Sequence, residues 1–476
     1  MIEHTKNTTF EEKELELLRK AVDTADKKTI QKIKLSNDIT SIIKILETFL
    51  RRKKVICYGG TAINSILPDK VKFYNKDVEI PDYDFFSPRA LTHAKELAEL
   101  YVKNGYHDVE VRSGMHKETY KVFVNFIPIA DITQLDMNVF TLLLTNSIRK
   151  DGIYFAAPDY LRMQTYNELA RPNGDVSRWE KIYKRLLLLN KYYPFIENPK
   201  CSQMNFMRDF TGSPELNDTL YTLIKDIMIN EGVIFLGGYA STLYARYDTS
   251  EKGKKKVVQH VPDFDVLSED PLTVAYIIKE KLENKGFKNV KINKKPPVGN
   301  DIIMTHYEIV VGEDTVCFIY EPYGCFSYNT IKLNGNTVKI ATIETMLLFL
   351  IAFLYSARPY YETDRIICMA QFLINIQAQH RLEQKGVLKR FNINCYGTEK
   401  TIIELRSEKA EKYAKLKQQK ESKEYNKYFF KYTPADMREK PRQQQKTEKS
   451  RQKFKIHKGK TTRKKNLFRN VLSKLF

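Results

Sequence analysis

Hydrophobic residues follow two different patterns along the chain. Between Phe10 and Arg52 they recur every three or four positions among charged residues, which predicts two or three amphipathic helices. The segment Val55-Ile56-Cys57-Tyr58 is instead a short continuous apolar run that two glycines end, as in a buried strand. The apolar run from Met346 to Tyr355 is shorter than the ~20 residues of a membrane span, so it predicts a buried helix.

Several landmarks of this pattern occur twice in the same order. Each copy has an apolar run ending in Gly-Gly, a Pro-Asp-x-Asp segment, a Gly-aromatic pair and finally Ala-Arg-Pro. Four matched landmarks at nearly constant spacing indicate two copies of one α/β module, about 55–195 and 230–385, that arose by duplication. The matched segments are 58–62 with 236–240, 81–87 with 262–268, 105–106 with 286–287, and 170–172 with 357–359.

The net charge is concentrated near the C-terminus. Of the 476 residues, 79 are Lys or Arg and 58 are Asp or Glu, a net of +21. Residues 400–476 hold 25 of the basic and 8 of the acidic residues, a net of +17, which leaves only +4 for the remainder. We expect a helix over 401–427 and, beyond Tyr432, a segment that is disordered or folds on a partner. Such a tail favours a polyanionic partner, nucleic acid before membrane, because no lipidation motif accompanies it.

Cysteine usage and the N-terminal residues bear on the cellular compartment. The six cysteines, at positions 57, 201, 317, 325, 368 and 395, have no spacing typical of metal ligands and suggest no disulfide framework. The first residues contain no apolar signal segment. We therefore expect a soluble protein of a reducing compartment.

Two carboxylates stand two positions apart at Asp82 and Asp84. If this segment is a strand, both acids project to one face while Tyr83 and Phe85 point into the core. Adjacent carboxylates repel one another unless a cation lies between them. Mg²⁺ commonly binds through one or two carboxylates and substrate phosphates, so the pair favours a metal site for a nucleoside triphosphate. The alternative is an ordinary surface Asp-x-Asp.

Neighbouring segments strengthen the metal-site interpretation. Gly59, Gly60 and Thr61 end the first strand and lead into a helix, where glycines let the backbone approach a phosphate and free N–H groups face the anion. An ordinary Gly-Gly turn is the alternative. Asp131 lies in a later apolar strand, where a buried carboxylate needs a cation or a strong donor nearby. Asp136 is a competing candidate, although its loop-like setting favours a surface or capping role.

Gly-Gly-Thr, Asp-x-Asp and a lone strand Asp together resemble the signature of the polymerase-β-like nucleotidyltransferases. The duplication and the segments 81–87 and 177–181 further resemble the poly(A) polymerase catalytic subunits of large cytoplasmic DNA viruses. The resemblance covers residues 55–385. The interval from Gly60 to Asp82 is wider than is usual in the family, which we attribute to a loop inserted around 70–79.

The resemblance implies template-independent addition of AMP from ATP to the 3′ end of RNA. Asp82 and Asp84 would hold two Mg²⁺ or Mn²⁺ ions, and Asp131 would complete the site of the ion that activates the primer hydroxyl. The turn 59–61 would cradle the β- and γ-phosphates. The resemblance also implies a single-stranded RNA partner, a homodimer or a processivity subunit, and a location in the cytoplasm of an infected host cell or in the virion.

The fold implied is α/β (α+β), with two tandem nucleotidyltransferase-like domains in a pseudo-twofold arrangement, facing each other across an RNA-binding cleft. An N-terminal helical segment, 1–54, precedes a catalytic domain, 55–195. A second, degenerate domain, 196–390, is followed by 391–476, a helical and then basic, partly disordered RNA-binding tail.

The second copy departs from the signature of the first. It keeps Asp263 and Asp265 after its Gly-Gly, and a tyrosine stands where the first copy has its threonine. The strand 316–320 has no Asp in the place of Asp131, and Glu321 falls a couple of residues away. We therefore expect the first copy to be catalytic and the second to be structural or RNA-binding.

Basic residues supply further candidate contacts. Arg162, near a basic helix that also carries Trp179, could meet the triphosphate or the primer, and a solvated helix face is the alternative. Lys254, Lys255 and Lys256 belong to a loop inserted between the second Gly-Gly and its Asp-x-Asp, which favours contact with RNA phosphates.

Three other functions fit parts of the sequence. An Asp-x-Asp glycosyltransferase explains the paired carboxylates but neither the Gly-Gly-Thr turn nor the basic tail. A non-catalytic RNA-binding protein with two degenerate copies would bind RNA in a salt-dependent manner without turnover. A nucleotidyltransferase acting on a small molecule or a protein would leave the tail without a purpose. Nothing in the sequence identifies a residue that reads adenine.

Overall fold

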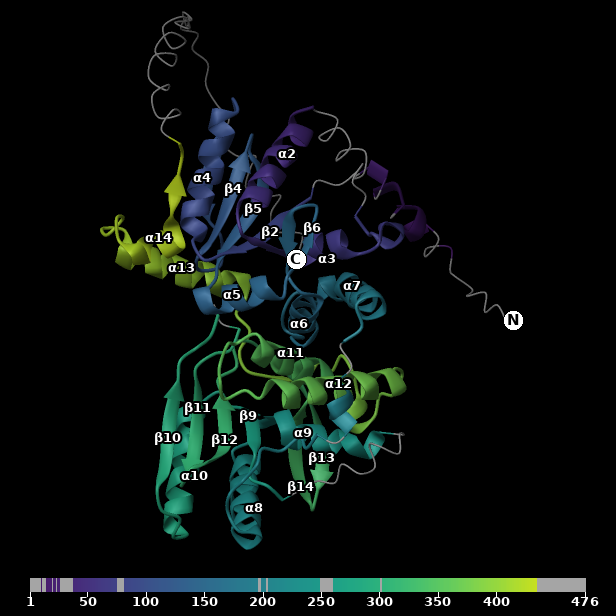
Figure 1. The fold of residues 1–476 in the computed structure, drawn as a ribbon, viewed down its shortest axis with the longest axis vertical. Helices are drawn as coiled ribbons and strands as arrows, with labels where there is room; N and C mark the ends of the chain where they lie inside the picture. Colours follow the sequence, from purple (N-terminus) through teal and green to yellow (C-terminus); the bar gives the residue numbers. More distant parts are fainter. Residues whose placement is uncertain are drawn as a thin grey trace, which may run out of the picture. The chain divides into compact units, whose positions relative to one another are not determined.

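The computed structural model describes residues 10, 14–18, 20–22, 24–25, 37–74, 81–195, 198–202, 204–248, 260–299 and 302–434. The compact unit to which almost all of these residues belong extends to Thr433. It contains two eight-stranded sheets, each accompanied by helices (Figure 1). The fold is thus of the mixed α/β class that the sequence predicts.

The first sheet is built around the strand that the sequence predicts before the Gly-Gly turn. β1 (Ile56–Tyr58) is antiparallel to β2 (Tyr83–Ser87) and parallel to β7 (Ile153–Phe155). The order of strands is β16-β3-β4-β5-β2-β1-β7-β6. The other strands of this module are β3 (Val109–Ser113), β4 (Thr119–Val124), β5 (Ile127–Gln134) and β6 (Ile148–Lys150).

The second sheet repeats seven strands of this topology, whereas β16 of the first sheet and β15 of the second have no counterpart. Its order is β10-β11-β12-β9-β8-β14-β13-β15, so that β8 takes the place of β1, β9 that of β2 and β12 that of β5. The pairing directions also agree, because β8 is antiparallel to β9 and β9 is parallel to β12. This correspondence confirms the duplication. The strands are β8 (Ile234–Leu236), β9 (Phe264–Leu267), β10 (Val290–Lys295), β11 (His306–Val311), β12 (Asp314–Tyr320), β13 (Phe326–Leu333), β14 (Asn336–Ala341) and β15 (Cys395–Tyr396).

The helices recur in the same way. Gly105 and Gly286, matched in the sequence, follow the ends of α4 and α10 with φ angles of 89° and 90°, a conformation that favours glycine. The corresponding pairs are α2 (Asn37–Arg52) with α8 (Pro214–Asn230), α3 (Gly59–Ile66) with α9 (Gly237–Tyr244), α4 (Ala90–Lys103) with α10 (Pro271–Asn284), α6 (Pro158–Leu169) with α11 (Ile343–Leu354), and α7 (Trp179–Tyr192) with α12 (Thr363–Gln379), while α5 (Met137–Thr145) lies between β5 and β6.

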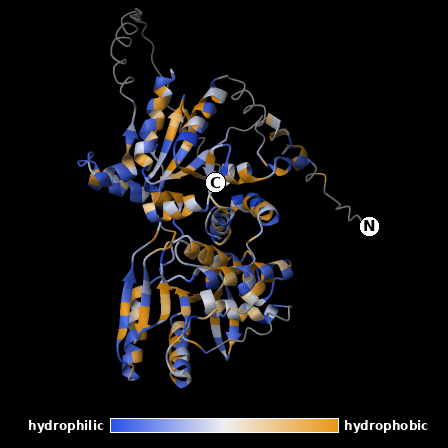
Figure 2. Ribbon diagram, viewed as in Figure 1, coloured by the Kyte–Doolittle hydropathy of each residue, from blue (hydrophilic) through white to orange (hydrophobic). Residues whose placement is uncertain are grey.

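The two modules pack against each other through α6 and α11. The backbone N–H of Ser327 also donates to the carbonyl of Ala170 at 2.8 Å across this contact. α11 is buried along nearly its whole length and is hydrophobic over most of it (Figure 2), which confirms the predicted buried helix. No helix among the described residues combines the length and apolar character that crossing a membrane requires.

The chain after the second module returns to the first. The predicted helical stretch forms α13 (Ile402–Leu416) and α14 (Lys423–Phe429), and β16 (Lys431–Tyr432) then pairs with β3 at the edge of the first sheet. The predicted helical stretch is therefore confirmed, and the chain up to Tyr432 packs against the first module. The basic residues beyond 434, and the predicted RNA-binding residues Lys254, Lys255 and Lys256, lie outside the described residues.

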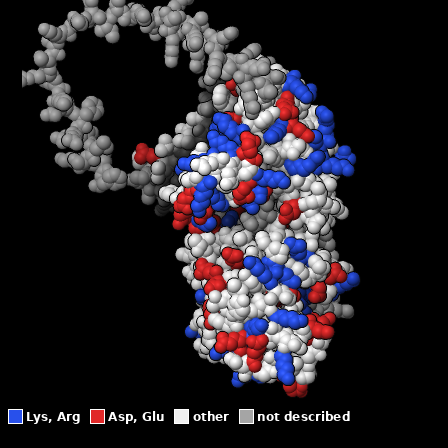
Figure 3. Space-filling model, turned by 90° about the vertical axis from the view of Figure 1, so that its left-hand side faces the viewer, with Lys and Arg blue, Asp and Glu red and all other residues white. Residues whose placement is uncertain are grey.

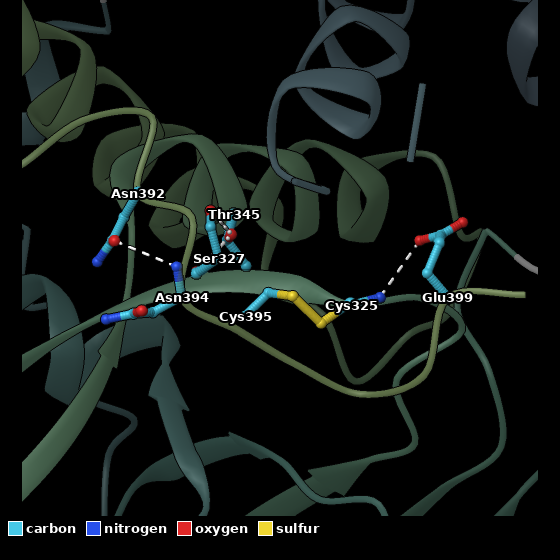
Figure 4. Close-up of a disulfide and its surroundings, with 7 residues drawn as sticks. All are labelled: Cys325, Ser327, Thr345, Asn392, Asn394, Cys395 and Glu399. Carbon is cyan, nitrogen blue, oxygen red and sulfur yellow. Dashed lines mark hydrogen bonds between the residues drawn. A yellow bond between two sulfur atoms is a disulfide. The ribbon is translucent and has the colours of Figure 1, made fainter. Parts of the chain in front are cut away.

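Four of the six cysteines form disulfides, Cys201–Cys368 and Cys325–Cys395, with Cα atoms 5.0 and 5.2 Å apart. The second bond holds β13 to β15, and Glu399 accepts a hydrogen bond from the backbone N–H of Cys325 beside it (Figure 4). The prediction of no disulfides is thus wrong, and the argument from cysteines to a reducing compartment falls with it. The paired cysteines are 167 and 70 positions apart, so their spacing gives no sign of the pairing.

Candidate active site

Asp82, Asp84 and Asp131 are neighbours on one face of the first sheet. β2 and β5 are adjacent parallel strands, and their register places Asp84 directly beside Asp131. The side chains of Tyr83 and Phe85 are buried in the core, whereas Asp84 is half-buried and Asp82, just before the strand, is exposed. The predicted alternation along this strand is therefore confirmed.

Electrostatic repulsion couples the three carboxylates. Burial, and then the charges of Asp82 and Asp131, raise the pKa of Asp84 to about 7. Burial, and then the charge of Asp131, likewise raise the pKa of Asp82. Lys121 of β4 forms an ion pair with Asp131, which supplies the strong donor that the sequence predicts for this acid. Asp136, the competing candidate, is exposed at the N-cap of α5.

The donor set fits a hard divalent cation. Burial and neighbouring negative charges raise the pKa values of Asp82 and Asp84, and Mg²⁺ or Mn²⁺ would supply positive charge to this group through oxygen ligands. In the side-chain arrangement of the described residues, no three acidic, histidine or cysteine side chains converge closely enough to hold an ion. To bind a metal ion, the Asp131 carboxylate would have to break its ion pair with Lys121.

The Gly-Gly-Thr turn presses directly against these acids. Gly59 has a φ of +72°, and a Cβ atom there would lie 2.7 Å from an oxygen of Asp84, so only glycine fits. The hydroxyl of Thr61 donates to the backbone carbonyl of Asp82 at 2.5 Å and thereby braces that residue. Tyr58, the N-cap of α3, provides no side-chain cap, which leaves the first N–H groups of the helix without one.

Arg185 of α7 brings a cation to the same turn. A Cβ atom on Gly60 would lie 2.9 Å from two guanidinium nitrogens of Arg185 and 2.6 Å from the hydroxyl of Tyr74. Arg185 donates to that hydroxyl at 2.6 Å and lies over the ring of Phe73, 5.1 Å from its centroid. Its Nε atom is buried, and no residue that the structure describes forms a hydrogen bond with it. The sequence shows Arg185 only as one of several cations on a helix, and tertiary contact alone singles it out.

Arg162 occupies a structural position. Its side chain is fully buried, and its guanidinium donates to Asn190 at 2.8 Å, to Asp159 and to the carbonyl of Tyr193. With these partners Arg162 binds α6 to α7, and its enclosure leaves no face for a triphosphate. The predicted phosphate contact of Arg162 is therefore corrected, and the residue is left out of the proposal below.

The second module fills the equivalent place with arginine. Asp263 and Asp265 are both buried, and the register of β9 and β12 places Phe318 beside Asp265, where the first module has Asp131. The backbone N–H of Arg208 donates to Asp263 at 2.8 Å, and its guanidinium contacts Asp263 and, at 3.4 Å, Asp265. Arg365 also pairs with Asp263, at 3.0 Å.

The glycine turn of the second module is also covered. A Cβ atom on Gly238 would lie 2.6 Å from the backbone carbonyl of Phe206, and both glycines of this turn are buried. A phosphate therefore has no room at this turn. The absence of a third acid, which the sequence predicts, is confirmed.

Comparisons with known proteins agree with this site. A family model described as "Poly(A) polymerase catalytic subunit" matches residues 44–175, which include all three acids of the first module. A protein of Acanthamoeba polyphaga mimivirus described as "Putative poly(A) polymerase catalytic subunit" is 26% identical over 447 residues, covering 83% of this chain and 72% of that protein. A protein of the same description from African swine fever virus (isolate Pig/Kenya/KEN-50/1950) is 31% identical over 163 residues, 33% of this chain and 34% of that protein.

A solved structure extends the likeness to almost the whole chain. The crystal structure of the Megavirus polyadenylate synthase matches with a TM-score of 0.75, covering 96% of this chain and 92% of that one. At 20% sequence identity this match shows a shared fold. The family model matches the first module, and the sequence and fold matches extend over most of the chain. The chain is thus similar to viral poly(A) polymerase catalytic subunits, as its motifs predict.

Proposed function

We propose that this chain is a template-independent poly(A) polymerase, which transfers AMP from ATP to the 3′ hydroxyl of RNA. The observation that carries the proposal is the juxtaposition of Asp82, Asp84 and Asp131 with the Gly59–Gly60 turn. This arrangement combines ligands for divalent cations with a backbone surface for phosphate. The similarity to viral poly(A) polymerase catalytic subunits supports ATP as the nucleotide and RNA as the acceptor.

The carboxylates would hold two Mg²⁺ or Mn²⁺ ions, with Asp82 and Asp84 shared and Asp131 completing the site nearest the primer. Bound ions of this kind stabilise the attacking and leaving oxygens of an in-line displacement. The bond from the primer 3′ oxygen to the α-phosphorus forms while the bond to the β-phosphate oxygen breaks, pyrophosphate leaves, and the hydroxyl proton is released to solvent. The chain therefore needs no covalent nucleophile.

The turn and its neighbours would bind the triphosphate. The backbone of Gly59 and Gly60 and the N-terminal N–H groups of α3 face the anion, and Arg185 adds a positive charge beside Gly60. Thr61, through its bond to the carbonyl of Asp82, keeps the turn and the metal ligands in register.

RNA would be bound outside the chemical site as well. Residues 434–476 contain 15 Lys or Arg against 3 Asp or Glu, a net of +12, which favours electrostatic contact with RNA phosphates. Lys254, Lys255 and Lys256 are proposed for the same role. The relatives carry the words "catalytic subunit" in their descriptions, so a second copy of this chain or a processivity subunit belongs to the proposal.

The test is primer extension with each of the four nucleoside triphosphates in turn, with Mg²⁺ or Mn²⁺, on wild-type protein beside Asp82→Asn. We expect the wild type to extend an RNA primer with ATP far better than with the other nucleotides. We expect no extension by Asp82→Asn. A wild-type protein that extends no primer under either metal would contradict the proposed function.

A further inference from the structure

A cavity of about 860 Å³ adjoins the carboxylates of the first module. Its wall includes Phe86 and Thr133, which lie two residues beyond Asp84 and Asp131 on the same strands. Residues two apart share a face of the sheet and are about 7 Å apart along a strand, so the cavity continues the face that carries the acids. Tyr58, the register partner of Asp84, also lines it. The cavity is thus placed where the sugar and base of a nucleotide would lie if its phosphates met the acids.

The charges on the cavity wall balance. Three cationic side chains face three carboxylates, and one pair, Arg171 with Glu399, forms an ion pair at 3.3 Å. Positive and negative side chains are likewise interspersed over the face of the molecule in Figure 3. A balanced wall is poorly suited to several phosphates and suits a neutral polar ligand such as a nucleobase. The six side chains are Lys117, Arg171, Lys400, Glu269, Glu321 and Glu399.

Aromatic rings form a flat part of the wall. Tyr58 is stacked on Phe86, with centroids 3.9 Å apart and planes within 11° of parallel. Tyr160 meets the edge of Phe86, with centroids 5.8 Å apart. The hydroxyl of Tyr58 shares a hydrogen bond with Thr133 at 3.0 Å, which fixes the plane of its ring. Such surfaces stack bases with little regard to their identity.

Two carboxamides on α6 supply the chemistry that would distinguish one base from another. Tyr160, Gln164 and Asn167 follow one another at helical spacing along one face of α6, and all three line the cavity. Asn167 accepts a hydrogen bond from the hydroxyl of Tyr323 at 2.9 Å, which orients its amide. The side-chain oxygen of Gln164 is buried and has no hydrogen-bond partner among the described residues. Because an unpaired buried acceptor is costly, this oxygen favours a ligand that brings a donor.

We infer that this cavity takes an adenine ring, with Gln164 and Asn167 as the residues that read it. A carboxamide both accepts and donates, which matches the N6 amino group and the adjoining ring nitrogen of adenine. Gln164, by a turn of its amide, accepts from the N6 amino group, and the stacked Tyr58 and Phe86 support the ring. The inference rests on the proposed function and adds to it the residues that select adenine.

The test compares ATP with ITP, in which an oxygen replaces the N6 amino group. We expect the wild type to use ATP with a kcat/KM at least about tenfold above that for ITP, in line with the discrimination that a matched base contact provides. In Gln164→Leu the ratio should fall to within about twofold, through a loss on ATP with ITP almost unchanged. Gln164→Glu, which keeps an acceptor for the amino group, should retain more of the ratio than Gln164→Leu.

Three primers, ending in A, U or inosine, distinguish the two possible sources of the adenine, the incoming ATP and the terminal adenylate of the RNA. If the cavity takes the base of ATP, the ATP/ITP ratio falls in Gln164→Leu on primers ending in A and on primers ending in U. If it takes the terminal base, that ratio stays and a preference for a terminal A over a terminal inosine is lost instead. Asn138→Ala, which removes an exposed carboxamide on α5, is the control and should change neither ratio.

Folding of each variant is checked by its thermal unfolding midpoint, and Asn167→Leu provides a second variant if Gln164→Leu does not fold. A folded variant that retains both ratios at wild-type values would overturn the inference and leave the proposed function intact. A wild-type protein without any extension activity would instead contradict the proposed function itself.

Discussion

The two modules place an aspartate pair at the same point of the same topology, and they neutralise it in opposite ways. In the first module the acids are half-buried or exposed, repel one another, and have Lys121 as a close cation only at Asp131. In the second module the acids are buried and held by Arg208 and Arg365. A duplicated site that acquires internal cations no longer needs an ion from solution, and it becomes part of the core.

The glycine turn is also more tightly covered in the second module than in the first. The backbone of Phe206 closes over Gly238, whereas Gly60 faces the ends of two side chains, Arg185 and Tyr74. Side-chain ends can move aside for a phosphate more easily than backbone can. The contrast leaves the first turn, and not the second, open to the phosphate binding that we propose.

The largest expected difference between the copies is in activity. Asp82→Asn or Asp84→Asn should lower the rate of AMP incorporation by about 10³-fold or more, because under the proposed function each removes a metal ligand on which charge stabilisation in the transition state depends. Asp263→Asn should leave the rate of the folded protein within a few-fold of wild type. An inactive Asp263→Asn beside an active Asp82→Asn would reverse the assignment of the catalytic copy.

The next difference is in stability. Arg208→Ala should lower the free energy of unfolding by about 3–5 kcal/mol, since it leaves two buried carboxylates short of a partner. Lys121→Ala, which removes the partly exposed partner of Asp131, should cost about 0–1 kcal/mol. Urea denaturation of the metal-free proteins measures both. If both variants lost the same free energy of unfolding, Asp263 and Asp265 would contribute no more to the stability of the core than the acids of the first module do.

Arg185 provides a test within the first module. Arg185→Ala should raise the KM for ATP about tenfold, because it removes a charge-assisted contact to the triphosphate, and Arg185→Lys should restore part of the loss. Lys184→Ala is the matched control, since Lys184 is the exposed neighbour on α7 and pairs with Glu180. Steady-state kinetics with varied ATP and saturating primer give the KM for ATP of Arg185→Ala and of the Lys184→Ala control. An unchanged KM in Arg185→Ala would remove Arg185 from the nucleotide site.

A further expected effect is a pH dependence of the stability of the metal-free protein. Folding raises the pKa of Asp84 from 3.8 to about 7, so between these values the folded state holds a proton that the unfolded state has released. Stability should therefore fall as the pH rises from about 4 to about 7, and Asp84→Asn should flatten part of this slope. Mn²⁺ should restore stability at the upper end, where Asp84 is ionised.

Urea midpoints across this pH range, with and without Mn²⁺, measure the effect. Asp136→Asn, at an exposed position, is the control and should leave the slope unchanged. A slope that Asp84→Asn does not alter would mean that the repulsion among the three acids is not present in solution.

Much of the site follows from short segments of sequence. A strand requires Asp82 and Asp84 to share a face, and a sharp turn against an acid requires glycine at position 59, so both features are local. The sequence predicted that Asp131 has a cation or a strong donor as its partner, but it did not identify Lys121. Arg162 was misread because a buried arginine and an exposed one look alike in a sequence, and only its contacts with α7 show the difference.

The sequence by itself determined the repeat, the Gly-Gly-Thr and Asp-x-Asp motif of the first copy and the absence of a third acid in the second, because each is written in the order of residues along one strand or turn. Only the tertiary structure decided what neutralises each aspartate pair, since Arg208 and Arg365 come from segments 55 and 102 positions away from Asp263. The same holds for the two disulfides, for Arg185 beside Gly60 and for the return of β16 to the first sheet. Contacts between distant segments depend on how the elements pack, and packing leaves no periodic trace in the sequence.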